Sequence, residues 1–337
     1  MDNINIEINV EKPEFVVIGD PHFSNQTPSC RIDNYSETCL EKLCFVLDYC
    51  IKNIIQLVIF EGDFFHKQQI PIFYISKLIL VLNKKRNEFR VRNGKDMTIV
   101  SIIGNHDLPF ENYKFIERSP IFLMFETGSL QHFNYIKLIS NKGKDTHLSL
   151  FDYNTEIKKS CFDDECCIAH CFFDFAFAKD SPSEKDRISE EDAKNLGYKV
   201  YFFGHDHNFY GITKKDEYYV IRSGSLLRNS SHIQQINRIT CFYHVKHYDK
   251  YEFEKVLVEC CKPSENVFSK ESITKPKKIV VEESTKERIS EIILQLSEEK
   301  EENNSAQSIF DKIIKERCVS EEVKSVLTRY LKMENIV

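Results

Sequence analysis

Short apolar runs alternate with segments of helical periodicity in the first hundred residues. Residues 14–19, 56–60 and 97–103 are apolar runs of the length expected for buried strands. Between them, residues 35–53 and 72–82 carry apolar side chains at helical spacing. The order strand, helix, strand, helix, strand predicts a mainly parallel sheet layered by helices.

Beyond residue 107 the pattern changes to short strands separated by loops. The strands are expected at residues 147–153, 166–169, 199–203, 218–221 and 239–245. A second sheet, packed on the first, would accommodate all five. The chain becomes polar from Lys262, where we place a linker, and three amphipathic helical segments follow it. We therefore expect an α/β fold of two packed sheets with a helical tail.

Composition narrows the class of protein. The chain has 337 residues, of which 42% are hydrophobic and 12% aromatic, with only 10 Gly and 9 Pro, and this composition excludes a collagen and a largely disordered chain. Its formal net charge of −6 argues against a general polycation that coats nucleic acid, although a local basic groove remains open. No apolar run approaches the ~20 residues that cross a bilayer, and residues 1–13 lack the features of a signal peptide. We expect a cytoplasmic protein with no membrane contact.

The twelve cysteines do not form a recognisable disulfide framework. Several lie within apolar strand or helix patterns, and no C-x-x-C occurs. Cys161, Cys166 and Cys171 lie close together along the chain, which leaves a zinc site open as a minor alternative. Reduced thiols in a reducing compartment are the preferred interpretation.

Side chains of the metal-ligand type follow five of the predicted strands. These residues are Asp20 and His22, Asp63 with His66, Asn105 with His106 and Asp107, His170, and His205 with His207. One such residue alone would be a turn, a cap or a core histidine. Five occurrences at the carboxyl ends of successive strands predict a common site, since open α/β sheets bind their ligands there.

The residue types indicate the chemistry of this site. Asp, His and Asn without Cys form a mixed oxygen and nitrogen site for Mn²⁺, Fe²⁺, Zn²⁺ or Mg²⁺. A pair of metals needs a bridging carboxylate, and such pairs serve the hydrolysis of phosphate esters. We therefore expect two divalent metal ions, with Mn²⁺ as the first choice.

The ordered motifs Asp-x-His, Gly-Asp, Gly-Asn-His-Asp, a lone His and Gly-His-x-His resemble those of the calcineurin-like metallophosphoesterase superfamily. The resemblance covers roughly residues 14–245 and implies a four-layer αββα sandwich. It implies that one metal is held by Asp20, His22 and His207, that a second is held by Asn105, His170 and His205, and that Asp63 bridges both. It also implies that His106 protonates the leaving oxygen and that Asp107 orients His106.

Two local sequences are similar to those of SbcD-type DNA repair nucleases. In the sequence Gly62-Asp63-Phe64-Phe65-His66, the resemblance implies that His66 positions the nucleic-acid phosphate. The loop from Ser223 to Arg228 resembles a Pro-Gly-Ser-x-x-Arg loop, with Ser223 in place of proline, and implies that Ser225 and Arg228 bind substrate. A basic cluster and a group of phenylalanines are weaker signs of DNA contact, since a solvated helix end and core packing explain such residues more often. The cluster is Lys84, Lys85, Arg86, Arg90, Arg92 and Lys95; the phenylalanines are Phe172, Phe173, Phe175 and Phe177.

The preferred hypothesis is a metal-dependent nuclease, exo- or endonucleolytic, that acts on DNA in recombination and repair. It resembles the compact phage versions of the SbcD-type subunit, in which case the host cytoplasm would be its location. Its expected partners are DNA and an SbcC-type coiled-coil ATPase, bound through the C-terminal helices, and a homodimer is open. One alternative is a small-molecule phosphodiesterase or phosphatase of the same superfamily. The other is a non-catalytic scaffold, which the complete set of ligand positions disfavours.

The expected domain organisation has three parts. Residues 13–248 form the catalytic domain, residues 249–283 an extended segment and linker, and residues 284–337 the helical tail that docks on a partner.

Overall fold

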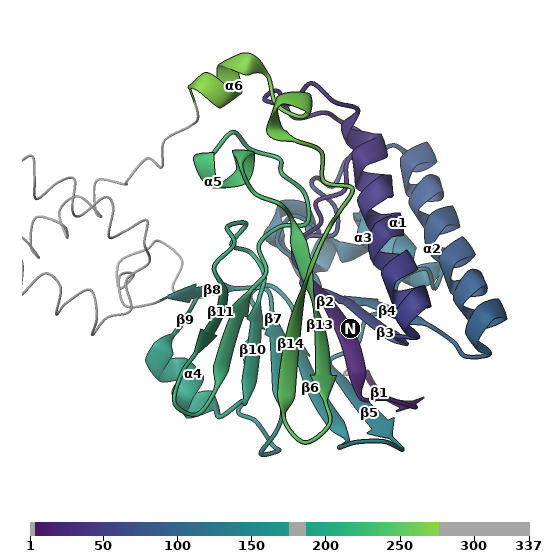
Figure 1. Ribbon diagram of the computed structural model, residues 1–337, viewed down its shortest axis with the longest axis vertical. Coiled ribbons are helices and arrows are strands. Elements are labelled where there is room, and N and C mark those ends of the chain that lie inside the picture. The colour runs from purple at the N-terminus through teal and green to yellow at the C-terminus, as the bar shows by residue number, and fades with distance from the viewer. Residues whose placement is uncertain (1–3, 175–186, 276–337) are drawn as a thin grey trace, which may run out of the picture. The chain divides into compact units, whose positions relative to one another are not determined.

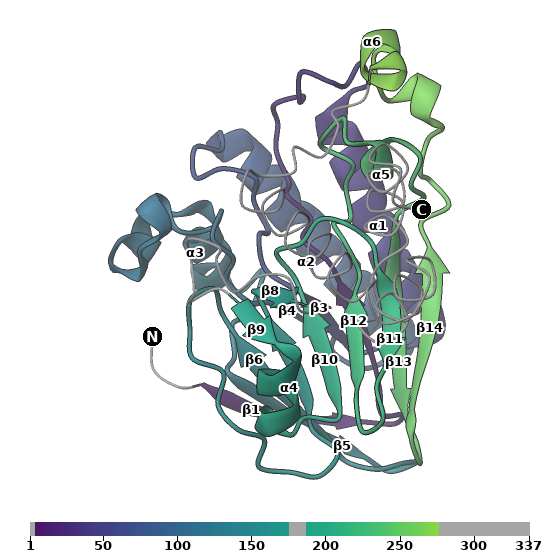
Figure 2. The same ribbon diagram turned by 90° about the vertical axis from the view of Figure 1, so that its left-hand side faces the viewer.

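The computed structural model describes residues 4–174 and 187–275. Contacts divide the chain into two units, the first made of residues 1–172 and 191–277 and the second of residues 173–190 and 278–337. The first unit contains both large sheets and every helix that covers them (Figures 1 and 2). A short pair of strands, β8 (Phe172–Asp174) and β9 (Arg187–Ser189), forms a separate two-stranded sheet.

The first sheet has five strands in the order β14-β13-β2-β3-β4. Its strands are β2 (Glu14–Ile18), β3 (Leu57–Phe60), β4 (Thr98–Ser101), β13 (Cys241–His247) and β14 (Tyr251–Leu257). β2, β3 and β4 are parallel, with Phe15 opposite Leu57 and Val58 opposite Ile99. The connections between them are α1 (Tyr35–Asn53) and α2 (Ile72–Asn93), as expected for right-handed β-α-β units. The predicted parallel sheet is therefore confirmed.

The second sheet has seven strands in the order β1-β5-β6-β7-β10-β12-β11. Its strands are β1 (Asn5–Val10), β5 (Tyr135–Ser140), β6 (Thr146–Phe151), β7 (Cys166–Ala169), β10 (Val200–Phe203), β11 (Gly211–Lys214) and β12 (Tyr219–Arg222). β6, β7, β10 and β12 run parallel to one another. The smaller helices are α3 (Pro120–Glu126), α4 (Glu190–Leu196), α5 (Ile233–Ile236) and α6 (Lys270–Thr274).

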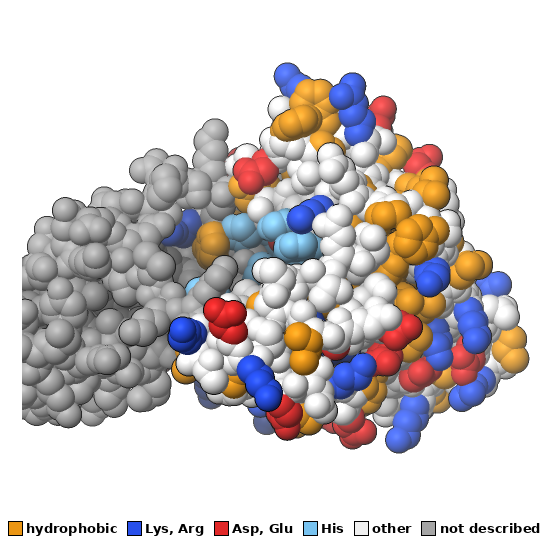
Figure 3. Space-filling view, turned by 90° about the horizontal axis from the view of Figure 1, so that it is seen from above, with side chains coloured by type: hydrophobic (Ala, Val, Ile, Leu, Met, Phe, Trp, Pro, Cys, Tyr) orange, Lys and Arg blue, Asp and Glu red, His pale blue; other side chains and the backbone are white. Residues whose placement is uncertain are grey.

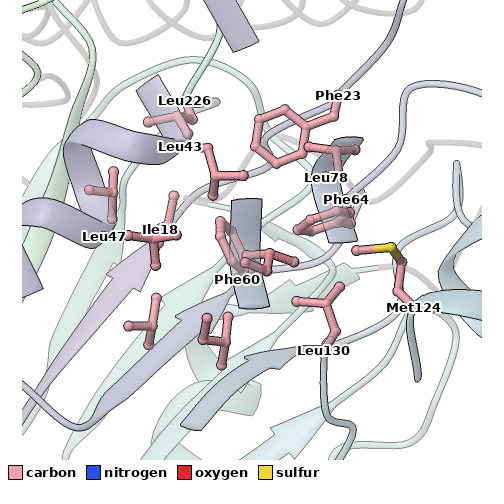
Figure 4. Close-up of a cluster of buried hydrophobic side chains, with 14 of the residues drawn as sticks. Ile18, Phe23, Leu43, Leu47, Phe60, Phe64, Leu78, Met124, Leu130 and Leu226 are labelled. Atoms are coloured by element: carbon pink, nitrogen blue, oxygen red, sulfur yellow. The ribbon is translucent and has the colours of Figure 1, made fainter. Parts of the chain in front are cut away.

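Alternate residues of β2 and β3 pack into two different cores, which explains why both strands are continuous apolar runs. Ile18 and Phe60 belong to the cluster that includes Leu43 and Leu47 of α1 (Figure 4). Phe15, Val17, Leu57 and Ile59 point to the other face and pack against apolar residues of the seven-stranded sheet. Because side chains alternate between the faces of a strand, a strand buried on both faces must be apolar throughout. This arrangement confirms two packed sheets flanked by helices.

Three expectations about the elements need correction. The strand at residues 239–245 was expected in the second sheet, but β13 pairs with β2 in the first, with Tyr243 opposite Val17. The helix expected at residues 72–82 continues to Asn93. Residues 249–283 were expected to be an extended segment and linker; they begin with β14, and Phe268 is then buried against Ile236. The first unit therefore extends past residue 248.

The expected helical tail at residues 284–337 lies outside the described residues, as do Phe175 and Phe177. Within the described ranges, no helix is long and apolar enough to cross a membrane. The cysteines of these ranges are all free thiols, and none of the candidate metal-binding groups found there contains a cysteine. The preference for reduced thiols over a zinc site is consistent with this arrangement.

Candidate metal centre

The ligand-type residues meet at one edge of the sandwich, where β2, β3, β4, β7 and β10 end. The backbone N–H of His205, which follows β10, donates to Asp20 Oδ2, which follows β2, at 2.8 Å. The two sheets therefore bring their carboxyl ends together at this edge, as the parallel strands predict. Several histidines gather on this face in the space-filling view from above (Figure 3).

A first group of potential ligand atoms comes from Asp20, His22, Asp63 and His207, all within 4.8 Å of one another. The Nε2 atoms of His22 and His207 lie 2.6 Å apart. Asp20 Oδ1 and Asp63 Oδ2 are buried and have no hydrogen-bond partner among the described residues. Buried carboxylate oxygens without a partner are costly, and a bound cation would satisfy them. The donor set therefore fits a divalent metal.

A second group consists of Asp63, His170 and His205, again within 4.8 Å. Asn105 adds a side-chain oxygen that lies 3.2 Å from His170 Nε2. The Nδ1 atom of His170 lies 2.7 Å from the carbonyl oxygen of Glu61, so Nδ1–H donates there and Nε2 is free to bind a metal.

Asp63 belongs to both groups. Its Oδ2 atom lies 3.5 Å from His22 Nε2 in the first group and 3.5 Å from His170 Nε2 in the second. Its other oxygen, Oδ1, accepts from the backbone N–H of His106 at 2.8 Å. One oxygen is thus fixed by the protein and the other faces both groups, which suits a bridging ligand. The two groups together form a site suited to two metal ions.

Three of these residues adopt left-handed backbone conformations. His22, Asp63 and His205 have φ values of 48°, 48° and 77°, and they lie in the loops that follow β2, β3 and β10. Such a conformation costs a non-glycine residue roughly 1–2 kcal/mol. Gly104 must also remain small, because a Cβ there would lie 2.1 Å from Asp63 Oδ1.

Electrostatic coupling is strong within the cluster. Burial raises the pKa of Asp20 to about 7. Burial alone would lower the pKa of His170, but the carboxylates of Asp63 and Asp20 outweigh it and raise this pKa to about 10. Burial likewise opposes ionisation of Asp63, yet His170 holds the pKa of Asp63 below its usual range. Asp63 therefore stays ionised beside His170, whereas burial disfavours the charged form of Asp20.

His106 lies beside the metal-binding groups, and a hydrogen bond to the backbone fixes its ring. Its Nδ1 atom lies 2.8 Å from the carbonyl oxygen of His66, which leaves Nε2 free. The ring of His66 stacks on the ring of His106 at 5.5 Å and an interplanar angle of 16°. The ring of His22 lies 4.9 Å from the ring of His106. His106 also forms a third group of potential ligand atoms with His22 and His66, all within 4.8 Å of one another. Its free Nε2 atom can exchange a proton at the site.

The position of Asp107 differs from the role implied by the resemblance. Its carboxylate accepts the backbone N–H groups of Phe64, Phe65 and Gly104 at 3.0–3.1 Å. The ring of His106 is held instead by the His66 carbonyl. Asp107 therefore fixes the loop that carries Asp63 and does not orient His106 through its ring.

The assignments of Ser225 and Arg228 as substrate-binding residues need correction. Both are buried, with exposed fractions of 1% and 3%. The hydroxyl of Ser225 donates to the carbonyl of Leu227 at 2.6 Å. The guanidinium of Arg228 donates to the carbonyls of Ile236 and Lys262. These contacts come from segments beyond the motif and hold the loop in place, so neither side chain is offered to a substrate.

We expect Arg228→Met to destabilise the fold. The substitution leaves buried carbonyls without donors, so the free energy of unfolding should fall by about 2–4 kcal/mol. Chemical denaturation measures this loss. Arg90→Met is the control, since the Arg90 side chain is 67% exposed and pairs with exposed Asp96. If Arg228→Met unfolds like the control but loses substrate affinity, Arg228 binds substrate after all.

Three further side chains organise the site without belonging to its motifs. Gln68 donates to the carbonyls of His106 and Leu108 at 3.1 and 3.2 Å. Arg238 donates to the carbonyl of His207 at 3.2 Å. Glu61 is buried, and burial raises its pKa to about 8. The only sequence signal for Glu61 is its position directly before Gly62 and Asp63.

The basic cluster of α2 is largely neutralised. Lys85 pairs with Asp48, Arg92 with Glu88 at 2.7 Å, and Arg90 with Asp96 at 2.6 Å. Lys95 pairs with Glu11 at 3.2 Å. Glu11 and Asp48 are distant from the cluster in sequence, so the local pattern does not predict them as partners. A solvated, ion-paired helix face is the better interpretation, and the cluster gives no support for DNA contact.

Of the two described phenylalanines that were considered for base stacking, Phe173 is buried and Phe172 is exposed. The ring of Phe172 lies 4.0 Å from the ring of His205. Phe172 therefore packs against a member of the second group.

The chain was compared with protein families, with curated proteins and with solved structures. A family model described as calcineurin-like phosphoesterase matches residues 13–209. No curated protein matches the chain. Among solved structures, the chain is similar to the crystal structure of a dimetal phosphatase from Danio rerio, with a TM-score of 0.43 and 11% identity over 74% of this chain and 97% of that one. The match over residues 13–209 establishes that this chain belongs to the calcineurin-like phosphoesterase family, whose members hydrolyse phosphoester bonds with the help of metal ions.

Proposed function

We propose that the chain is a two-metal phosphodiesterase and that its substrate is DNA. Asp20, His22 and His207 would hold one divalent metal. Asn105, His170 and His205 would hold the other, with Asp63 as the bridge. When bound, such a metal pair polarises the phosphoryl oxygen and acidifies a water molecule. Mn²⁺ is the first candidate because the ligands combine carboxylate, amide and imidazole groups.

The chain's own contribution to the proposed reaction is proton transfer and positioning. His106 would donate a proton from Nε2 to the leaving oxygen, while Nδ1 stays bonded to the His66 carbonyl. Asp107 and Gln68 keep the loops around His106 in place through backbone hydrogen bonds. A proton donor with a fixed ring loses little entropy in the transition state.

The position of His66 carries the proposal of a phosphodiester substrate. A nitrogen of His66 lies within 4.8 Å of nitrogens from His22 and His106. A phosphodiester carries two alkoxy groups. His106 would protonate the one that leaves, and His66, beside it, would position the phosphate that still carries the other. The resemblance of the sequence from Gly62 to His66 to the SbcD-type nucleases supports DNA as this diester. The alternative is a small phosphodiester or a phosphomonoester.

The substitution His66→Ala tests the choice between these substrates. It should lower kcat/KM for DNA cleavage by about tenfold or more relative to cleavage of a small chromogenic phosphodiester, since loss of one positioned contact is worth about 1.4 kcal/mol. Both reactions are measured with the same metal-loaded preparation. Equal losses on the two substrates would contradict a role for His66 in binding the polymer.

The partner proposal rests on the sequence pattern of residues 284–337 and on the resemblance. An SbcC-type coiled-coil ATPase would bind the amphipathic segments of this region, and residues 13–275 would retain the metal centre. Co-purification of the full chain with such an ATPase, compared with a chain that ends at residue 283, tests it. Unchanged affinity of the shorter chain would place the docking surface elsewhere.

A further inference from the structure

A cavity of about 520 Å³ lies outside the metal centre but next to it. It lies where β6 ends and β5 begins, and the segment of residues 155–161 borders it. Its size falls within the range of small-molecule sites in proteins.

Aromatic side chains form much of the cavity wall. They are Tyr113, Tyr135, Phe151 and Tyr198. Two of them are fixed by hydrogen bonds to backbone carbonyls: Tyr113 donates to Tyr153 at 3.2 Å, and Tyr198 donates to Lys158 at 2.9 Å. Rings that are held in place lose little freedom when a planar ligand stacks on them.

A buried, hydrogen-bonded pair of side chains forms another part of the lining. His132 Nε2 lies 2.9 Å from Asp152 Oδ2, and both residues are buried. Asp152 Oδ1 also accepts the backbone N–H of Ile103 at 2.8 Å. Ile103 directly precedes Gly104 and Asn105 of the metal centre. Asp152, which lines the cavity, is thus bonded to the backbone that leads into the metal centre.

Tyr153, which follows Asp152 in the chain, lies beside the second metal-binding group. Its ring lies 6.2 Å from the ring of His170 and 5.8 Å from that of His205. Its backbone N–H donates to the Ile103 carbonyl at 2.8 Å. A ligand that shifted Asp152 would therefore act on the backbone that supports the second metal-binding group.

Two cations at the cavity remain without acidic partners. Lys158 and Lys159 belong to its lining and are exposed. Among the ion pairs of the described residues neither lysine takes part, in contrast to the basic residues of α2. Two glutamates also line the cavity. The carboxylate of Glu165 already accepts from the Ser160 hydroxyl and the Cys161 N–H at 2.9 Å, and Glu156 is exposed to solvent. The lysines thus offer positive charge to an anionic group.

From these features we infer that the cavity binds a ligand with a planar aromatic ring and a phosphate group, of the class of nucleoside monophosphates. Aromatic walls would stack on the base, and Lys158 and Lys159 would pair with the phosphate. This identification rests on the proposed function, because a nuclease that acts on DNA ends releases mononucleotides. The ligand would then be a reaction product that regulates the metal centre through Asp152 and Tyr153.

Calorimetry with deoxyadenosine monophosphate tests the inference on the full chain in EDTA, which keeps metals from binding the phosphate at the other site. One molecule should bind per chain. The double substitution Lys158→Ala and Lys159→Ala should weaken binding by about tenfold or more, since it removes two charge-assisted contacts. Lys142→Ala with Lys144→Ala is the matched control, because these lysines lie outside the cavity lining and pair with Glu11 and Asp164. Deoxyadenosine and inorganic phosphate should each bind at least about tenfold more weakly than the nucleotide.

A second variant examines the aromatic wall independently of charge. Tyr135→Leu should also weaken nucleotide binding, whereas Phe162→Leu should not, because Phe162 stacks beside Tyr135 without lining the cavity. Absence of binding, or equal binding by the lysine variant and its control, would overturn the inference. Binding of phosphate alone as tightly as the nucleotide would do the same. Because the assay contains no metal and no DNA, failure here is distinguishable from failure of the nuclease proposal.

Discussion

Replacing Asp63 with asparagine is expected to abolish hydrolysis. The substitution removes the negative charge shared by the two metal-binding groups, where Oδ2 lies 3.5 Å from a nitrogen of each. Since metals contribute several kcal/mol to such reactions, turnover should fall by at least about a thousandfold. Metal content, measured on the purified variant by mass spectrometry, should fall below that of the wild type. Both measurements follow directly from the bridging position.

The matched control for Asp63→Asn is Asp249→Asn, which removes a carboxylate from the exposed turn between β13 and β14. This control should retain activity and metal content. An Asp63→Asn protein with wild-type turnover and two metals per chain would refute the bridging assignment. An intermediate result, one metal with residual turnover, would mean that only one of the two groups depends on Asp63.

A second large effect is expected for His106→Gln. The ring lies beside the metal-binding groups, and its Nδ1 is bonded to the His66 carbonyl. Glutamine can keep a hydrogen bond but cannot exchange a proton near neutral pH, so turnover should fall by about 10²–10⁴. Metal content should remain at the wild-type level. In the wild type, activity should fall at high pH as the general acid loses its proton. This fall should be absent from the pH profile of the variant's remaining activity.

His147→Gln is the control for this experiment, since His147 lies on β6 and stacks on Phe162 away from the metal centre. Its activity should match that of the wild type. Loss of metal from His106→Gln, with activity restored by excess Mn²⁺, would make His106 a ligand and would leave the proton donor unidentified.

The sequence predicted the location of the site better than the roles of its neighbours. Asp20, Asp63 and His170 each follow a buried strand, and parallel strands place their carboxyl ends at one edge. That inference needs only local patterns. The positive φ values of His22 and His205 could not be predicted, because they depend on the packing of both sheets around the turn. The backbone conformation that orients these two histidine side chains was therefore visible only in the structure.

Residues that support the site were mispredicted where their partners are remote. Arg228 is bonded to the carbonyls of Ile236 and Lys262, and the latter lies 34 residues away. A motif of six residues contains no information about such a partner. The same limitation affects β13, most of whose residues are buried: the sequence pattern predicts a buried strand but not its neighbour, β2. The charged half of α2 likewise depends on the remote Asp48.

The meeting of His22 and His207 also has a consequence for folding. Their Nε2 atoms are adjacent although 185 residues separate them in the chain. Closing so long a loop costs conformational entropy that grows with the logarithm of its length. A cation held by both histidines would act as a reversible cross-link, and at a thousand times its dissociation constant it would stabilise the folded state by about 4 kcal/mol. The free metal concentration would then determine how long the chain resists unfolding and proteolysis, as well as how fast it turns over substrate.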